Sequence, residues 1–557
     1  MRSAIGDDDQ RHPFIRIADL GLRTSGNSPE PLTLEAVTRL VAGACDLPYF
    51  RIDPLKIDVE AVTSLVSQAY ATRFGFLPVI VTDKEVTIAS GEPFVDEWEA
   101  EIGRILRRRI QRVLANPRDI ERYLREFYGV SRSITGASIK SDSHDRTVTN
   151  NFEQLTELGA VGEPDANDRH IVHLVDWLLQ YAFEQRASDI HIEPRREQSN
   201  IRFRIDGVLH LIHQLPTTVI SAITSRMKSL GRMDVADKRR PQDGRIRTKA
   251  PGGQEIERRL STMPTTFGEK LVLRIFDPEK LTQPFESLGF DREELAKWNE
   301  IVDQPHGMIL VTGPTGSGKT TTLYSALKQI ARPQINVCTI EDPIEMVEPS
   351  FNQMQVQPTL EIDFATGVRT LLRQDPDVIM VGEIRDRETA DVAIQAALTG
   401  HLVLSTLHTN DAPSAVTRLM DIGVPPFLIG ATLLGEIAQR LVRILCEHCK
   451  QPGSVSEQAW NSLVAPMRSA VPTGVMQAGS CDECRHTGFR GRQGIYEVMQ
   501  VNQELATLIA PQMELAALKR LALKHGLRPL NIAGAQKIAH GKSTLDEVIR
   551  VVSLAET

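Results

Sequence analysis

Residues 313 to 320 read Gly-Pro-Thr-Gly-Ser-Gly-Lys-Thr and fit the phosphate-binding pattern G-x-x-x-x-G-K-[ST]. A short apolar run precedes this loop, and the residues after it carry apolar side chains at helical spacing. The pattern predicts a strand, a glycine-rich loop whose N–H groups surround an anionic phosphate chain, and a helix start that adds positive charge. An ordinary glycine-rich turn is the alternative, and the flanking patterns disfavour it.

The phosphate loop also supplies the side chains expected to hold a nucleoside triphosphate. Lys319 is expected to reach the β- and γ-phosphates, and the hydroxyl of Thr320 is expected to ligate magnesium. The residues assigned to nucleotide binding are Gly313, Pro314, Thr315, Gly316, Ser317, Gly318, Lys319, Thr320 and Thr321.

Two later apolar runs end in acidic residues that could serve hydrolysis. Val378–Val381 is followed by Gly382 and Glu383. Because Gly382 stands where an aspartate is usual, Glu383 is expected to act on water or on hydrated magnesium. An earlier run ends in an acidic stretch whose Glu341 and Glu345 are candidates to poise the nucleophile. Taken alone, each run is equally compatible with a buried strand that ends in a solvated acidic loop.

Histidines flank a third apolar run, with His401 before it and His408 after it. A histidine in this position could sense the γ-phosphate through a hydrogen bond. Either residue alone is also compatible with a purely structural histidine.

Two cysteine pairs, Cys446-x-x-Cys449 and Cys481-x-x-Cys484, have the spacing of a tetrahedral zinc site. Four thiolate ligands leave no open coordination position, so the zinc is expected to be structural rather than catalytic. Two pairs of unligated, buried cysteines are the alternative.

The composition bounds the class of protein. A chain of 557 residues is expected to form several domains, and 41% apolar with 24% charged residues is ordinary for a soluble globular protein. The net charge of −8 argues weakly against a general nucleic-acid binder. No apolar run approaches the roughly 20 residues that span a bilayer, and the acidic first ten residues do not form a signal peptide. We therefore expect a cytoplasmic protein that reaches a membrane only through partners.

The ordered motifs make the chain resemble the bacterial secretion ATPases of the type II secretion and type IV pilus assembly superfamily, of the GspE/PilB type. The motifs are the phosphate loop, an Asp box at 339–345, a Walker B run ending at Gly382-Glu383, and a His box at 401–409. The tetracysteine insertion resembles the GspE and PilB branch, and residues 439–443 and 491–497 lean toward GspE.

The resemblance implies an α/β fold: a RecA-like P-loop ATPase domain with a preceding α+β, PAS-like domain, a zinc-binding tetracysteine module and an N-terminal α/β docking domain. The expected ranges are an N-terminal partner-docking domain at 1–130, a flexible linker at 131–165, a second N-terminal domain at 166–280, the ATPase domain at 281–440, the tetracysteine module at 441–495 and a C-terminal helical region at 496–557. Within the first domain, a hairpin is expected around residues 79–88 and an amphipathic helix at Ile102–Leu114.

The resemblance further implies a homo-hexameric motor that uses ATP, Mg²⁺ and Zn²⁺ and docks on inner-membrane platform proteins through its N-terminal domain. It would drive pseudopilus assembly and protein secretion across the outer membrane, with type IV pilus extension as the alternative. ATP would lie between the ATPase domain and the preceding domain. The family's arginines at that junction map onto Arg204, Arg245, Arg259 and Arg274.

Two other classes of function remain as rivals. A RecA-like nucleic-acid translocase would need a basic groove with stacking aromatic residues, and only 5% of the residues are aromatic. A zinc-bearing scaffold without hydrolysis is disfavoured because Lys319, Thr320 and Glu383 are all present.

Overall fold

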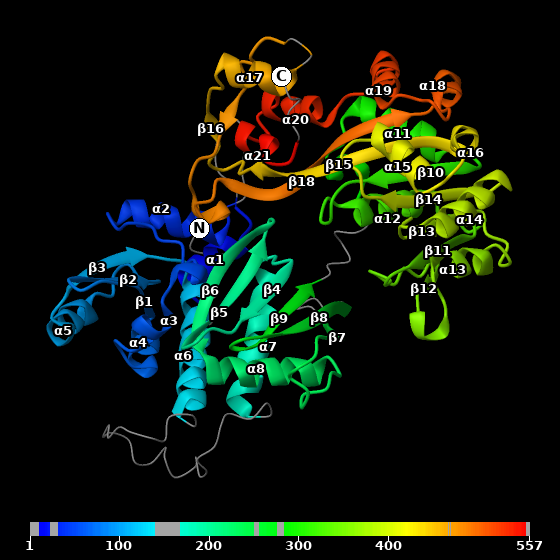
Figure 1. Ribbon diagram of the computed structural model, residues 1–557. Helices are drawn as coiled ribbons and strands as arrows, with labels where there is room; N and C mark the ends of the chain where they lie inside the picture. The colour runs from blue at the N-terminus through cyan, green and yellow to red at the C-terminus, as the bar shows by residue number, and fades with distance from the viewer. Residues whose placement is uncertain are drawn as a thin grey trace. The chain divides into compact units, whose positions relative to one another are not determined.

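A computed structural model of the chain divides into two compact units, Met1–Ile275 and Phe276–Thr557. Each unit is described by itself, and Figure 1 shows the elements of both. The structure describes residues 11–22, 32–139, 168–249, 255–275, 283–465, 467 and 469–552. Among these residues, no helix has both the length and the apolar character needed to cross a bilayer.

The first part of unit 1 is a small α/β domain with the sheet order β1-β2-β3. Its strands are β1 (Phe76–Val81), β2 (Glu85–Ser90) and β3 (Arg109–Leu114). Its helices are α1 (Pro13–Asp19), α2 (Leu34–Ala44), α3 (Val59–Thr63), α4 (Gln68–Phe74), α5 (Glu97–Leu106) and α6 (Pro117–Ile139). The antiparallel pairing of β1 with β2 confirms the predicted hairpin.

Two expectations for this region are wrong. The predicted helix at Ile102–Leu114 stops at Leu106, where Arg107 takes a left-handed φ of 52°, and its second half forms strand β3. The reason is tertiary: β3 satisfies its backbone hydrogen bonds by parallel pairing with β2. The linker also does not begin at 131, because α6 continues to Ile139. Most of the predicted linker, residues 140–165, lies outside the described residues.

The second part of unit 1 is a six-stranded antiparallel sheet with the order β6-β5-β4-β9-β8-β7. Its strands are β4 (Asp189–Glu193), β5 (Gln198–Ile205), β6 (Val208–Pro216), β7 (Gln242–Lys249), β8 (Glu255–Thr265) and β9 (Gly268–Ile275). Helices α7 (Arg169–Glu184) and α8 (Thr217–Leu230) share its apolar core. Asp206 and Gly207, with φ of 48° and 87°, form the predicted hairpin turn.

Unit 2 is built on a seven-stranded sheet with the order β12-β11-β13-β14-β10-β15-β18. Its strands are β10 (Gly307–Thr312), β11 (Val337–Glu341), β12 (Asn352–Gln355), β13 (Val378–Val381), β14 (Leu402–Leu407), β15 (Leu433–Leu445) and β18 (Phe489–Gln500). The pairings are parallel except that β18 runs antiparallel to β15. This arrangement confirms the predicted α/β fold around the phosphate loop.

Helices cover both faces of this sheet. One apolar cluster joins it to α10 (Phe285–Leu288), α11 (Arg292–Val302) and α12 (Lys319–Ile330). The cluster on the other face joins it to α13 (Phe364–Leu371), α14 (Arg387–Leu398), α15 (Pro413–Asp421), α16 (Pro426–Thr432), α17 (Glu457–Val464), α18 (Gln503–Leu508), α19 (Leu515–Lys524), α20 (Leu530–Ala539) and α21 (Leu545–Ile549). The C-terminal helices are therefore part of the same core as the phosphate-loop sheet.

The tetracysteine segment is an insertion between two neighbouring strands of that sheet. The predicted domain boundary at residue 440 falls inside β15, and the boundary at 495 falls inside β18. These two strands pair along most of their length, from Gly435 opposite Gln500 to Leu445 opposite Phe489. The sheet therefore resumes after the cysteines, and the ATPase domain does not end before them as predicted.

Candidate functional site

Four predicted motifs meet at one edge of the unit 2 sheet. Strands β11, β13, β14 and β10 are adjacent and parallel, so their carboxyl ends lie side by side. The phosphate loop follows β10, Glu341 ends β11, Glu383 follows β13 and His408 follows β14. His401 precedes β14 and lies at the opposite edge, where its Nδ1 is 2.9 Å from the carbonyl oxygen of Ala396. Its structural interpretation is therefore the better one.

The phosphate loop needs glycine at positions where the backbone is left-handed and crowded. Gly313, Gly316 and Gly318 have φ of 149°, 80° and 93°. A Cβ on Gly313 would lie 2.6 Å from the hydroxyl of Ser317 and 2.7 Å from the carbonyl oxygen of Gln439. The loop is thus a tight backbone turn at the start of α12, which is the geometry that a phosphate chain requires.

Lys319 is folded over this loop. Its Nζ donates to the carbonyl oxygens of Gly313 at 2.8 Å and Pro314 at 3.3 Å. Burial lowers the pKa of Lys319 to about 8, while the negative charge of Glu383 partly opposes that shift. Thr320 and Thr321 lie beside Lys319 in the first turn of α12 and are partly exposed. The lysine ammonium and the first turn of α12 therefore lie beside the glycine-rich loop.

Glu383 lies between a guanidinium and an imidazole. Its carboxylate pairs with Arg385, and its Oε2 is 3.6 Å from Nε2 of His408. The side chain of Glu383 is 17% exposed, whereas that of His408 is 54% exposed. Gly382 is closely packed, because a Cβ there would lie 3.2 Å from Cε1 of Phe364 and 3.3 Å from the carbonyl oxygen of Ile340, so these neighbours would have to shift slightly. The carboxylate of Glu383 is therefore partly exposed at the same edge of the sheet as the phosphate loop.

The acidic stretch after β11 contains one buried and one half-buried glutamate. Glu341 accepts hydrogen bonds from Tyr324 at 2.7 Å, Thr339 at 2.7 Å and Gln353 at 3.1 Å, and it is 4% exposed. Glu345 lies in the following loop and is half-buried. Glu341 therefore joins α12 and β12 to the end of β11 through hydrogen bonds.

The four predicted arginines form one row across the sheet of unit 1. Arg204 lies opposite Asp189, Asp189 opposite Arg274, Arg274 opposite Arg259, and Arg259 opposite Arg245. Directly opposed residues share a face of the sheet, so all four arginines lie on the same side. Asp189 lies 3.5 Å from Nε of Arg204 and 3.1 Å from Nε of Arg274. The structure brings together residues that are far apart in the sequence.

The four cysteines form a compact cluster between β15 and β18. All four sulfur atoms lie within 4.8 Å of one another, and three of the separations are 3.6 to 3.7 Å. A tetrahedron with Zn–S bonds of about 2.3 Å has S–S edges of about 3.8 Å. Gly488 also donates its N–H to Sγ of Cys484 at 3.2 Å. The donor set therefore fits a tetrahedral metal, which the cluster Cys446, Cys449, Cys481 and Cys484 would hold.

Comparison with known proteins identifies the family. The family model described as "Type II/IV secretion system protein" matches residues 165–550, well over half of the chain. The chain belongs to this family. A second family model, the MshEN domain, matches residues 45–134.

The relatives of this secretion ATPase carry two kinds of name. This chain is 53% identical over 544 residues to the type IV pilus assembly ATPase TfpB of Acinetobacter baylyi, and the match covers 98% of this chain and 93% of that protein. It is 45% identical over 385 residues to type II secretion system protein E of Aeromonas hydrophila, covering 69% and 76%. The ATPase DotB of Legionella pneumophila shares the fold, with a TM-score of 0.53 and 22% identity over 69% of this chain and 97% of that one.

These matches confirm the predicted GspE/PilB family and the predicted ATPase activity. The roles of individual residues remain predictions, although the phosphate loop, Glu383 and His408 do meet at one edge.

Several residues around the phosphate loop were not predicted as site residues. Gln439 on β15 donates to the carbonyl oxygen of Ser317 at 2.7 Å and accepts from Thr322 at 2.8 Å. Arg440 donates to the carbonyl oxygen of Asn410 at 3.0 Å. The run 439–443 appeared in the sequence only as a family signature. Polar residues inside an otherwise apolar strand were the signal that could have placed them in the site.

Proposed function

We propose that this ATPase powers the extension of a type IV pilus. The observation that carries the proposal is the extent of the matches. Relatives named type IV pilus assembly ATPases match 97 to 98% of this chain, including its N-terminal domain. Relatives named type II secretion system protein E match 69 to 78% of it. Type II secretion is the second candidate, favoured by identities of 40 to 45% over the shared part.

The geometry supports a division of roles in hydrolysis. Lys319 and the loop N–H groups bind the phosphates, and Thr320 would hold Mg²⁺, which when bound neutralises the developing phosphate charge. Glu383 orients the attacking water and accepts its proton, and His408 senses the γ-phosphate. Glu341, hydrogen-bonded below them, positions α12, and Glu345 remains a candidate to poise the nucleophile.

The arginine row supports an oligomer in which two units close around ATP. A row of guanidinium groups on one sheet face is suited to bind a transferring phosphate from outside. Because the arginines belong to unit 1 and the phosphate loop to unit 2, we propose closure of the two units in a homo-hexamer. In this assembly the 168–275 region acts as the PAS-like domain, and the N-terminal domain docks on inner-membrane platform proteins from the cytoplasm.

Inactivating the gene in its own bacterium tests which machine the protein drives. For a pilus assembly ATPase, we expect loss of surface pili and of pilus-dependent surface motility, with extracellular enzyme secretion retained. Electron microscopy of pili and activity assays on culture supernatants measure the two outcomes. Normal piliation with secreted enzymes trapped in the cell would contradict the proposal and support type II secretion. The wild-type gene on a plasmid, compared with a Glu383→Gln copy, serves as the control.

We propose that zinc fills the tetracysteine site and stabilises the insertion rather than the chemistry. Cys481→Ser is expected to lower bound zinc from about one per chain to well below half, because the binding free energy of such sites is largely folding free energy. Residues 446–488 should become sensitive to protease, while nucleotide binding is retained. Metal analysis and limited proteolysis measure both effects. Cys45→Ser, in unit 1, is the matched control. Wild-type protein purified without chelators but lacking zinc would refute the site.

A further inference from the structure

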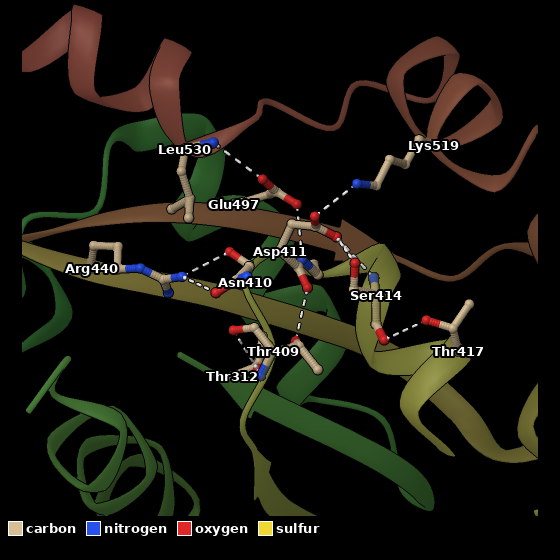
Figure 2. Close-up of polar contacts among 11 residues, drawn as sticks. Thr312, Thr409, Asn410, Asp411, Ser414, Thr417, Arg440, Glu497, Lys519 and Leu530 are labelled. Carbon is tan, nitrogen blue, oxygen red and sulfur yellow. Dashed lines mark hydrogen bonds and ion pairs between the residues drawn. The ribbon is translucent and has the colours of Figure 1, made fainter. Parts of the chain in front are cut away.

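The segment that follows β14, residues 408–412, is hydrogen-bonded to Thr312, the last residue of β10 before the phosphate loop. We call it the His408 loop. Thr409 donates its N–H to the hydroxyl of Thr312 at 2.8 Å, and the two threonine hydroxyls lie 2.7 Å apart. Arg440 holds the carbonyl oxygen of Asn410 from β15. Figure 2 shows Thr409 beside Thr312 and Asn410 beside Arg440. A shift of the loop that carries His408 would therefore act on the end of β10 through these hydrogen bonds.

The same loop is held from the other side by C-terminal elements. Lys519 on α19 donates to Asp411 at 2.8 Å. Ala412 donates its N–H to Oε1 of Glu497 at 2.9 Å, and Leu530, at the start of α20, donates its N–H to Oε2 at 3.1 Å. Figure 2 shows Glu497 between the loop and the C-terminal helices. One carboxylate on β18 therefore joins the His408 loop to α20.

Burying the carboxylate of Glu497 carries a desolvation cost. Glu497 is 3% exposed, and burial raises its pKa to about 7, an effect opposed by the N–H of Ala412. Glu436 on β15 is 0% exposed, and neither of its carboxylate oxygens has a hydrogen-bond partner among the described residues. The charged groups that act on Glu497 include Asp411 of the loop, Lys519 of α19 and Arg440 of β15, and Glu497 in turn acts on Glu436. An apolar residue of similar size at 497 would avoid the desolvation cost of the carboxylate but would leave the N–H groups of Ala412 and Leu530 without this acceptor. Packing alone therefore does not explain Glu497.

We propose that Glu497 is a positioning residue for ATP hydrolysis, which sets the His408 loop against the phosphate loop and couples it to α19 and α20. The proposal rests on the roles given above to His408 and Glu383. When His408 engages the γ-phosphate, the loop moves with it, and the bonds of Asp411 and Ala412 carry that displacement into the C-terminal helices. By reciprocity, a load on those helices alters the position of His408 beside Glu383.

Glu497→Gln tests this coupling with little change in side-chain shape. An amide has only one oxygen to accept from Ala412 and Leu530, and its NH₂ group faces the other N–H donor. In the full-length protein we expect kcat to fall about tenfold while KM for ATP changes less than about twofold. Glu504→Gln on α18 is the matched control, because the Glu504 side chain is 61% exposed and pairs with Lys524 and His525 at the end of α19.

A second variant and a second measurement separate positioning from simple stability. Lys519→Met should lower kcat in the same direction, and the double variant should lose less than the sum of both effects, because both act through one loop. Hydrogen exchange of residues 408–412 should be slowed by a non-hydrolysable ATP analogue in the wild type and much less in Glu497→Gln. If Glu497→Gln does not fold, the Lys519→Met result decides alone.

The proposal is overturned by unchanged kcat in both single variants. It is also overturned if only the melting temperature falls while kcat and the analogue-dependent exchange stay at wild-type values. A different result would show that the roles proposed for Glu383 and His408 are wrong. In that case Glu383→Gln would keep its turnover rate, whatever the rate of Glu497→Gln.

Discussion

Glu383→Gln is expected to retain ATP binding and to lower the turnover rate by at least about a hundredfold, the usual contribution of a general base. The amide keeps the shape of the side chain beside Arg385 and His408 but cannot accept a proton from water. The phosphate loop is untouched, so the dissociation constant for ATP should change little. Phosphate release under steady state and equilibrium nucleotide binding measure the two quantities.

Glu388→Gln provides the matched control for this prediction. Glu388 lies in the first turn of α14, close in sequence to Glu383, but its side chain is 61% exposed and pairs with Arg369. Its turnover should equal that of the wild type. Near-normal turnover in Glu383→Gln would show that another group accepts the proton, and Glu345 would be the next to replace.

The core of the site could be predicted because the necessary information is local. The phosphate loop lies between a continuous apolar run and a helical repeat, and each acidic motif directly follows its own buried strand. Parallel strands place such ends at one edge, and the pairing of β13 with β14 and of β14 with β10 then brings Glu383 and His408 near Lys319. The direction of β14 places His408, the predicted site residue, at this edge and His401 at the opposite one.

Features that depend on the pairing of strands far apart in the sequence could not be predicted from local patterns. Arg109–Leu114 fits either a helix continuing from Leu106 or a strand, and the parallel partner β2 decides between them. The arginine row likewise follows from the register of β4, β5, β7, β8 and β9, which no short pattern reveals.

The buried glutamates were missed for a related reason. Glu497 appeared in the sequence at the end of a family signature, and Glu436 lies in an otherwise apolar stretch. Both become buried only when β15 and β18 pair. The donors to Glu497, Ala412 and Leu530, approach only when α20 also packs on the sheet. A glutamate within a predicted buried strand is the sequence signal that could have indicated these residues.

Lys319→Ala is expected to weaken ATP binding and to lower turnover by at least about a hundredfold, because it removes a cation that is positioned for the β- and γ-phosphates. Lys328→Ala, in the last turn of the same helix, removes an equal charge that pairs with Glu348 and should leave turnover unchanged. Calorimetric titration with ATP and steady-state phosphate release measure both variants. Turnover within a few fold of the wild type in Lys319→Ala would remove Lys319 from the catalytic site.

The same lysine predicts a pH dependence whose sign follows from its burial. Burial lowers the pKa of Lys319 to about 8 in the nucleotide-free protein, whereas bound phosphate favours the charged form and raises it. Binding is therefore unaffected below about pH 8 and must take up a proton above it. The affinity for ATP should then fall by up to about tenfold per pH unit as the pH rises past 8, and Lys319→Ala should lack this slope. Equal slopes in the two proteins between pH 7 and 9.5 would show that another group titrates, since Lys319 is the residue whose charge the substitution removes.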